Sequence, residues 1–274
     1  MLIRREWMFL ALLLAVPITA AAGNVITDRD EKAVAVLQPG TVRPPETAFR
    51  TMAILHLAMF DAVNSVEPRY KPYNIRLSAT PDTSKEAAAA AAAATVLVKL
   101  VPDAATDVRS TLSSYLASLP DGEAKAKAVV LGEEAAAKIL VARENDGVSA
   151  PDAYRPRTKP GVYIPTAMPV GWPTASMTPF VLASPSQFRA KPPPSLKSAE
   201  WAKDCNEIKE LGAKNSTKRS ARQTEDARFW LLVGPRAYNP TPRQIVVAKN
   251  LELLDSAVHG ALLGSYGRWS SRVL

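Results

Sequence analysis

The sequence predicts an all-α protein, a helical bundle that carries one long loop rich in proline and aromatic residues. Two observations lead to this prediction. Between Met52 and Val66 apolar residues recur at steps of three and four, which is the spacing of one helix face. No stretch alternates apolar and polar residues between turn signals, as a half-buried strand does.

The helix predicted from Met52 to Val66 is the element around which the others are expected to pack. Apolar residues cover much of its circumference, a distribution typical of a buried helix. Its end is expected at Glu67, because the residue before Pro68 is pushed out of the helical conformation.

The other predicted helices are recognised by a capping residue or a proline in front and by turn residues behind. They span approximately residues 27–37, 85–100, 102–116, 123–144, 198–211, 220–232 and 241–258. Thr27 is the expected cap of the first. Eight consecutive alanines, Ala87 to Ala94, predict a helix that packs closely through small side chains.

A long loop is predicted between Val148 and Ser195. Eleven of the 23 prolines lie there, a density that no regular helix or strand tolerates. A disordered linker has little reason to carry aromatic residues, so we expect an ordered loop held onto the helices by its aromatic side chains. These are Tyr154, Tyr163, Trp172, Phe180 and Phe188. Loops of this length are often functional.

The first 22 residues have the pattern of a secretory signal peptide: Arg4 and Arg5, the apolar run Trp7 to Val16, and small residues up to Ala22. The apolar run is about half of the ~20 residues that a spanning helix needs. We therefore expect export to the periplasm or the extracellular space, cleavage near Ala22, and no stable membrane span afterwards.

The mature chain is expected to be a single helical domain with a first helical group (23–147), the loop (148–195) and a second helical group (196–274).

The formal net charge is +8, and +7 remains without the first 22 residues. Such a charge attracts phosphate, anionic lipid or nucleic acid in some proteins. Here the basic residues are scattered without a run of five, which favours a generally basic surface and gives no reason to expect a nucleic-acid partner. Cys205 is the only cysteine, so an intramolecular disulfide, a C-x-x-C redox site and a cysteine-built zinc site are excluded.

The segment His56 to Tyr73, HLAMFDAVNSVEPRYKPY, resembles the early core helix of bacterial vanadium-dependent haloperoxidase-like proteins, which belong to the type 2 phosphatidic acid phosphatase superfamily. The likeness continues through the alanine-rich helix and residues 120–140, 162–194 and 204–230, and fades after about His259. The resemblance implies a helical fold. It also implies that complete members use vanadate to oxidise halide with hydrogen peroxide, or hydrolyse phosphomonoesters in the same pocket.

In that family three motifs bind the anion: a lysine followed after six residues by Arg-Pro, then Pro-Ser-Gly-His, then Ser-Arg with a histidine six residues after the arginine. Lysine and arginine neutralise the oxygens of vanadate or phosphate. One histidine bonds to vanadium or attacks phosphorus, and the other serves as acid and base.

None of these motifs is present in this chain. The nearest Arg-Pro, Arg155-Pro156, has Val148 where the lysine of the first motif should stand, and Pro185-Ser186 continues as Gln187-Phe188 in place of the Gly-His of the second. For the third motif, Ser271-Arg272 has no later histidine, and His259 has Glu252 and Leu253 in place of Ser-Arg. His56 has the arginine, Arg50, but Phe49 in place of the serine.

The resemblance therefore implies a truncated haloperoxidase-like architecture, from a shortened or frameshifted gene or a short homologue. We expect no catalytic, cofactor-binding or metal-binding residues and no cofactor in this chain. Small anions or peroxide would bind only if a missing C-terminal half were supplied. A phosphatase-like phosphoesterase and a non-catalytic secreted helical binding protein are the alternatives, and self-association into a homo-oligomer is left open.

Several polar residues still qualify as candidates. His56 is expected to be a hydrogen-bonded core histidine, and Asp61 and Asn64 to cap a neighbouring loop or helix, in preference to binding a ligand. The run that contains Arg69, Tyr70, Lys71 and Tyr73 suits an anionic substrate or cation–aromatic packing. Glu133 and Glu134 are adjacent and diverge by about 100° on a helix, which is poor geometry for paired-carboxylate chemistry. His56 and His259 alone do not make a metal site.

Overall fold

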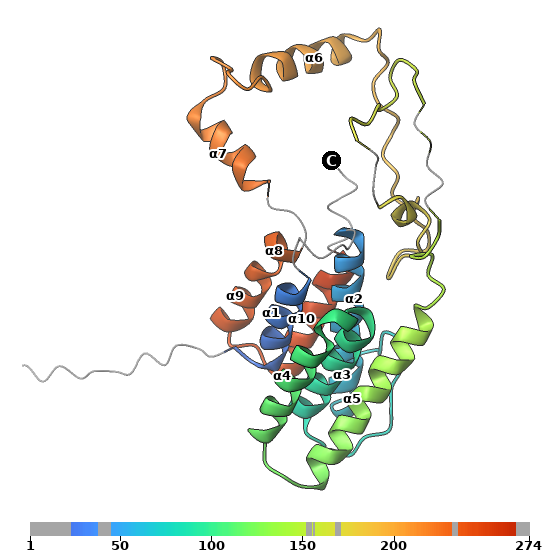
Figure 1. Ribbon diagram of the computed structural model, residues 1–274, viewed down its shortest axis with the longest axis vertical. Coiled ribbons are helices and arrows are strands. Elements are labelled where there is room, and N and C mark those ends of the chain that lie inside the picture. Colours follow the sequence, from blue (N-terminus) through green and yellow to red (C-terminus); the bar gives the residue numbers. More distant parts are fainter. Residues whose placement is uncertain are drawn as a thin grey trace, which may run out of the picture.

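The computed structural model describes residues 23–37, 45–151, 155, 157–167, 171–231 and 235–266. These residues form helices, turns and loops, and none of them forms a strand, which confirms the all-α prediction (Figure 1). The helices are α1 (Val25–Val36), α2 (Pro45–Val66), α3 (Lys85–Leu100), α4 (Ala105–Ala117), α5 (Glu123–Ala142), α6 (Ala199–Leu211), α7 (Ala221–Phe229), α8 (Pro235–Tyr238), α9 (Pro240–Ala248) and α10 (Leu253–Tyr266), with short 3-10 turns at Pro102–Ala104 and Trp172–Ala175. The predicted signal segment lies outside the described residues. No helix in the described ranges is long and apolar enough to cross a membrane.

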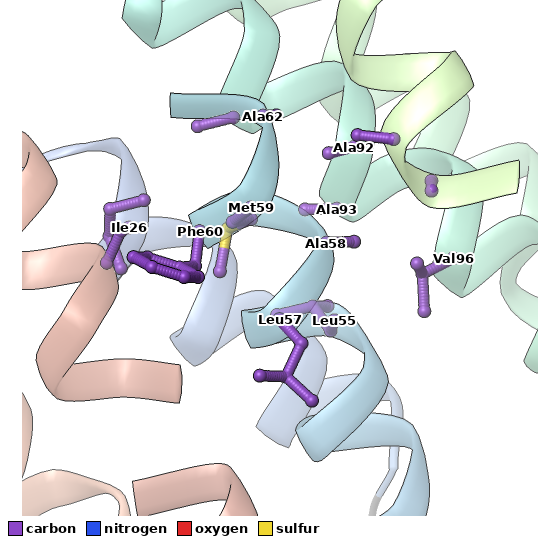
Figure 2. Close-up of a cluster of buried hydrophobic side chains, with 14 of the residues drawn as sticks. Ile26, Leu55, Leu57, Ala58, Met59, Phe60, Ala62, Ala92, Ala93 and Val96 are labelled. Carbon is purple, nitrogen blue, oxygen red and sulfur yellow. The ribbon is translucent and has the colours of Figure 1, made fainter. Parts of the chain in front are cut away.

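Helix α2 is the centre of the bundle, as predicted. Every side chain from Arg50 to Val66 is buried, and α2 packs against α1, α3, α5 and α10. Figure 2 shows Phe60 on the side of α2 that faces α1, and Ala58 on the side that faces Ala92 and Ala93 of α3. The helix ends at Val66, where Pro68 was expected to stop it.

The alanine run makes α3 a thin helix on which α5 packs closely. Ser84 caps α3 by accepting a hydrogen bond from the Ala87 N–H (3.1 Å), and the alanines that follow are buried. A Cβ added at Gly132 of α5 would lie 2.2 Å from the carbonyl oxygen of Ala88 and 2.9 Å from the amide nitrogen of Ala92. Both are backbone atoms, so side chains larger than hydrogen at Gly132 require the two helices to separate.

Two local expectations are wrong. Asn24, not Thr27, caps α1: its side-chain oxygen accepts the Ile26 N–H (3.0 Å), while the Thr27 hydroxyl donates to the Asn24 carbonyl (2.7 Å). The single helix predicted for 241–258 is two helices, α9 and α10. Asn250 in the turn between them has φ of 47°, a conformation that asparagine tolerates better than most residues and that ends α9.

The loop from 148 to 195 is attached to the bundle at Phe180. Phe180 is buried as expected, but Tyr163 is 71% exposed, so the expectation that Tyr163 holds the loop on the helices is wrong. Phe188 is 64% exposed. Tyr154 and the side chain of Trp172 lie outside the described residues. The attachment depends on Arg143, whose guanidinium lies 4.0 Å from the centre of the Phe180 ring.

Helices α6 and α7 extend away from the bundle, and none of their side chains is buried (Figure 1). The chain then returns with α8, α9 and α10, and α10 packs against α2 and α1. The second helical group therefore consists of an exposed pair of helices and a packed set.

Candidate functional site

The first cluster of buried polar groups is centred on Asp30 of α1. His56 of α2 donates from Nε2 to Asp30 Oδ1 (2.8 Å), and Asn239 donates to the same oxygen. Arg243 of α9 donates from Nη1 to Asp30 Oδ2 (2.7 Å). One carboxylate thus joins α1, α2 and the start of α9, and Asn239 lies 209 residues after Asp30 in the sequence.

The ring of His56 is buried between Asp30 of α1 and Gly260 of α10. Because the Asp30 carboxylate accepts from Nε2, this nitrogen carries a proton. Nδ1 is buried and has no hydrogen-bond partner. Gly260 of α10 covers it so closely that a Cβ there would lie 2.3 Å from Nδ1. A substrate therefore has no path to this nitrogen, and the prediction of a core histidine is confirmed.

Acid should weaken the contribution of Asp30 to stability. Burial disfavours its ionised form, but the bonds from His56, Arg243 and Asn239 outweigh burial and hold the pKa of Asp30 below its ordinary value of 3.8. A lowered carboxyl pKa stabilises the fold above the unfolded pKa, and this stabilisation is lost as pH falls through the folded pKa. The difference in unfolding free energy between the natural protein and Asp30→Asn should therefore shrink below pH 3.8. Urea unfolding from about pH 5 to pH 2 measures it, and a constant difference would contradict the assignment.

Asp61 and Asn64 of α2 bind the chain that leaves the helix. Asp61 accepts hydrogen bonds from the backbone N–H groups of Tyr73 (2.8 Å), Asn74 (2.8 Å) and Ile75 (3.0 Å). Asn64 exchanges two hydrogen bonds with the backbone of Tyr70. Burial raises the pKa of the Asp61 carboxyl, although the three N–H groups act in the opposite direction. The prediction that these two residues cap a loop is confirmed.

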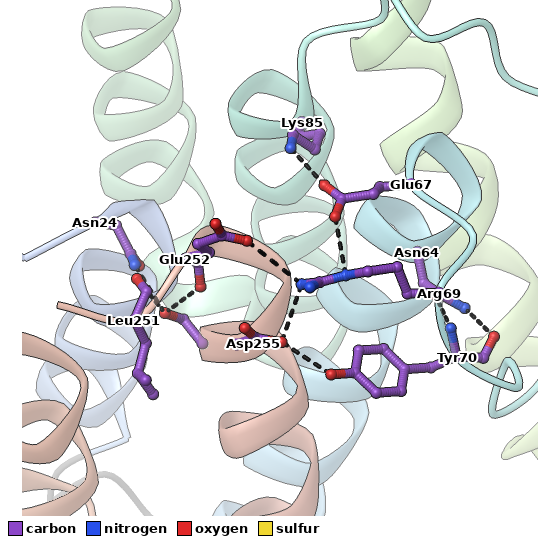
Figure 3. Close-up of polar contacts among 10 residues, drawn as sticks. Asn24, Asn64, Glu67, Arg69, Tyr70, Lys85, Leu251, Glu252 and Asp255 are labelled. Carbon is purple, nitrogen blue, oxygen red and sulfur yellow. Dashed lines mark hydrogen bonds and ion pairs between the residues drawn. The ribbon is translucent and has the colours of Figure 1, made fainter. Parts of the chain in front are cut away.

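The basic-aromatic run at Arg69 and Tyr70 ties this loop to α10 (Figure 3). Arg69 lies 2.9 Å from Glu67 and 3.0 Å from Asp255, and the Tyr70 hydroxyl donates to Asp255 (2.9 Å). The hydrogen bond to Asp255 raises the pKa of Tyr70. The Arg69 guanidinium also lies 5.6 Å from the centre of the Tyr70 ring, which is the cation–aromatic packing considered from the sequence.

A second buried cluster, the Asp146 clamp, consists of Arg50 of α2 with Arg143 and Asp146 at the end of α5. Arg50 donates to Asp146 Oδ2 from Nε (2.8 Å), and Arg143 donates to the same oxygen from Nη2 (2.9 Å). Arg50 also donates to the Arg143 carbonyl (2.6 Å). Two buried cations therefore share one buried carboxylate.

The Asp146 clamp also holds the long loop. Arg143 donates to the carbonyl oxygens of Thr178 (2.5 Å) and Pro179 (3.2 Å), and the Thr178 N–H donates to the Asp146 carbonyl (2.8 Å). Tyr73 donates from its hydroxyl to the Phe180 carbonyl (2.8 Å), and burial raises the pKa of Tyr73. Residues 177–180 are thereby fixed on the bundle.

Sequence reasoning did not find Asp30, Arg50 or Asp146. A partial signal existed for Asp30, which falls on the same helix face as Ile26 and Ala33, at steps of four and three. The local pattern places Asp146 only after the helix predicted for 123–144, and it gives Arg50 only a half match to the Ser-Arg motif. A long-range contact between residues 50 and 146 leaves no local pattern.

An open groove with a volume of about 520 Å³ lies between the 78–83 loop and α5. Its charged lining residues are Lys127 and Glu134, one of each sign, and the rest of the lining is small or apolar. Glu133 and Glu134 are both exposed on α5. Within the described part of the chain no group of three histidine, cysteine or carboxylate residues is placed to hold a metal ion.

The comparisons with known proteins are negative. No family model, no curated protein and no solved structure matches this chain.

Proposed function

We propose that this chain is a catalytically incomplete member of the vanadium-dependent haloperoxidase and type 2 phosphatidic acid phosphatase superfamily, a helical scaffold without turnover of its own. The ordered likeness from His56 to Trp230 supports the family. The segment His56–Tyr73, which resembles the family's early core helix, comprises the second half of the central helix and the loop that Asp61 and Asn64 bind.

The observation on which the proposal rests is that the hydrogen-bond donors of the buried arginines in the Asp146 clamp already have partners. Arg50 and Arg143 are the two buried cations that lie together, and both donate to Asp146 and to backbone carbonyls. Vanadate or phosphate would have to displace a buried carboxylate to reach them. The histidine that could assist, His56, belongs to the separate Asp30 cluster and is covered by Gly260. The described residues therefore do not fit vanadate, and we assign no reaction step to it.

Assays on the purified chain test this proposal. We expect no bromination with vanadate, hydrogen peroxide and bromide, no hydrolysis of a phosphomonoester, and no stoichiometric uptake of vanadate by vanadium NMR. Arg50→Ala and His56→Ala are the controls, because activity that both variants retain in full arises from neither buried cluster. Stoichiometric vanadate uptake that Arg50→Ala abolishes would overturn the proposal, and hydrolysis without bromination would favour the phosphatase alternative.

A non-catalytic binding protein is the second candidate function. The observation that favours it is the set of exposed apolar side chains on α6, on α7 and in the long loop, which include Ile208, Phe229 and Phe188. Surfaces of this kind are commonly interaction sites. Silence in both enzyme assays together with specific binding of a partner would support it.

A further inference from the structure

The positive charge of this protein is concentrated in the part that extends away from the bundle. Residues 148–231 contain thirteen Lys and Arg against seven Asp and Glu, so they carry a net +6 of the total +8. Residues 23–147, which form the first five helices, carry a net charge of −2. Within the extended part, α6 has a net charge of −2, whereas residues 212–231 have +3. We call residues 212–231 the basic tip.

The basic tip has a defined local structure. Arg219 donates to the carbonyl oxygens of Leu211 and Ala213 and so closes the turn after α6. Ser220 and Gln223 then start α7 with a reciprocal capping box. Lys218 lies three residues before α7 and Arg228 lies in its last turn, and both are exposed. Within α7 the charges balance, because Arg222 pairs with Asp226 (2.9 Å), so the net positive charge of the basic tip comes from the turn that precedes the helix.

Three consecutive apolar residues follow Arg228. Phe229, Trp230 and Leu231 are 63%, 63% and 77% exposed, and the two aromatic rings lie 5.2 Å apart, edge to face. Phe229 ends α7, and the three consecutive side chains form a compact apolar knob there, which differs from the stripe at steps of three and four that a helix lays into a protein groove.

We propose that the basic tip docks on an anionic lipid surface. Phenylalanine, tryptophan and leucine enter the boundary between headgroups and acyl chains, and lysine and arginine are attracted to anionic headgroups. A fluid surface accommodates a compact knob of this kind, and an extended anionic surface meets both Lys218 before α7 and Arg228 in its last turn. This inference does not depend on the proposed scaffold function.

Binding of the full chain to vesicles of equal parts phosphatidylglycerol and phosphatidylcholine tests the proposal, with vesicles of phosphatidylcholine alone beside them. Amide hydrogen exchange locates the contact, and we expect protection of residues 212–231 only on the anionic vesicles. This local measurement separates the basic tip from any contribution of the apolar residues 1–22. The double variant Lys218→Gln and Arg228→Gln should weaken binding through the tip about 30-fold, because each cation near an anionic surface contributes about fivefold.

Matched apolar variants complete the test. Trp230→Ser should abolish the protection of residues 212–231. Ile208→Ser removes a side chain that is 70% exposed, but from α6 with its negative net charge, and should leave the protection unchanged. Vesicle binding without protection of the basic tip, equal loss in both variants, or binding of a DNA oligonucleotide in place of vesicles would each overturn the proposal.

Discussion

Replacing Asp146 with alanine should lower the free energy of unfolding by about 3–5 kcal/mol. Asp146 is the carboxylate that Arg50 and Arg143 share, and all three side chains are buried. Its removal leaves two buried guanidinium groups without their anion, and the desolvation of both is then uncompensated. Urea unfolding followed by circular dichroism measures the loss.

The control for this prediction is Asp107→Ala. Asp107 also pairs with a cation, Lys32, but its side chain is 61% exposed. Exposed ion pairs contribute about 0–1 kcal/mol, so the control should lose little stability. Equal losses in the two variants would show that the Asp146 clamp is no more important than a surface pair.

A second expectation for Asp146→Ala follows from the bonds of Arg143 to Thr178 and Pro179. The variant should also increase amide exchange at residues 177–180.

Replacing Gly132 with leucine should cost about 3 kcal/mol or more, at the upper end of the range for overpacked cores. The new Cβ would lie 2.2 Å from the Ala88 carbonyl oxygen, and the rest of the side chain would have to enter the contact between α3 and α5. Because the obstructing atoms are backbone, no rotamer change relieves the clash. Thermal unfolding of the variant measures the cost.

Ala137→Leu is the matched control in the same helix. Ala137 is exposed on the outer face of α5, so leucine there meets no neighbour and should change stability by less than about 0.5 kcal/mol. Leucine is also a much better helix former than glycine, by almost 1 kcal/mol. Without the close contact, Gly132→Leu would therefore stabilise the protein, and a gain in stability would contradict the packing described here.

The polar residues of α2 illustrate what could be predicted about the candidate site. His56, Asp61 and Asn64 interrupt an apolar helix, and their isolation among buried neighbours was enough to predict that each is hydrogen-bonded within the fold. Their partners were not predictable: Asp30 lies 26 residues before His56, and the N–H groups that Asp61 binds belong to an irregular loop. A polar residue indicates that a partner is needed, but only the folded chain brings one to it.

The sequence alone determined the helical class, the buried central helix, its end before Pro68, and the close packing of the alanine helix, because periodicity, proline and side-chain size act over one or two turns. It also shows that the three motifs by which vanadium-dependent haloperoxidases bind their anion do not occur in this chain. Only the tertiary structure decided that Asp146 occupies the two buried arginines, that His56 is sealed by Gly260, and that α6 and α7 remain exposed. These features depend on contacts between distant segments, and such contacts are set by how whole helices pack, which no local pattern records.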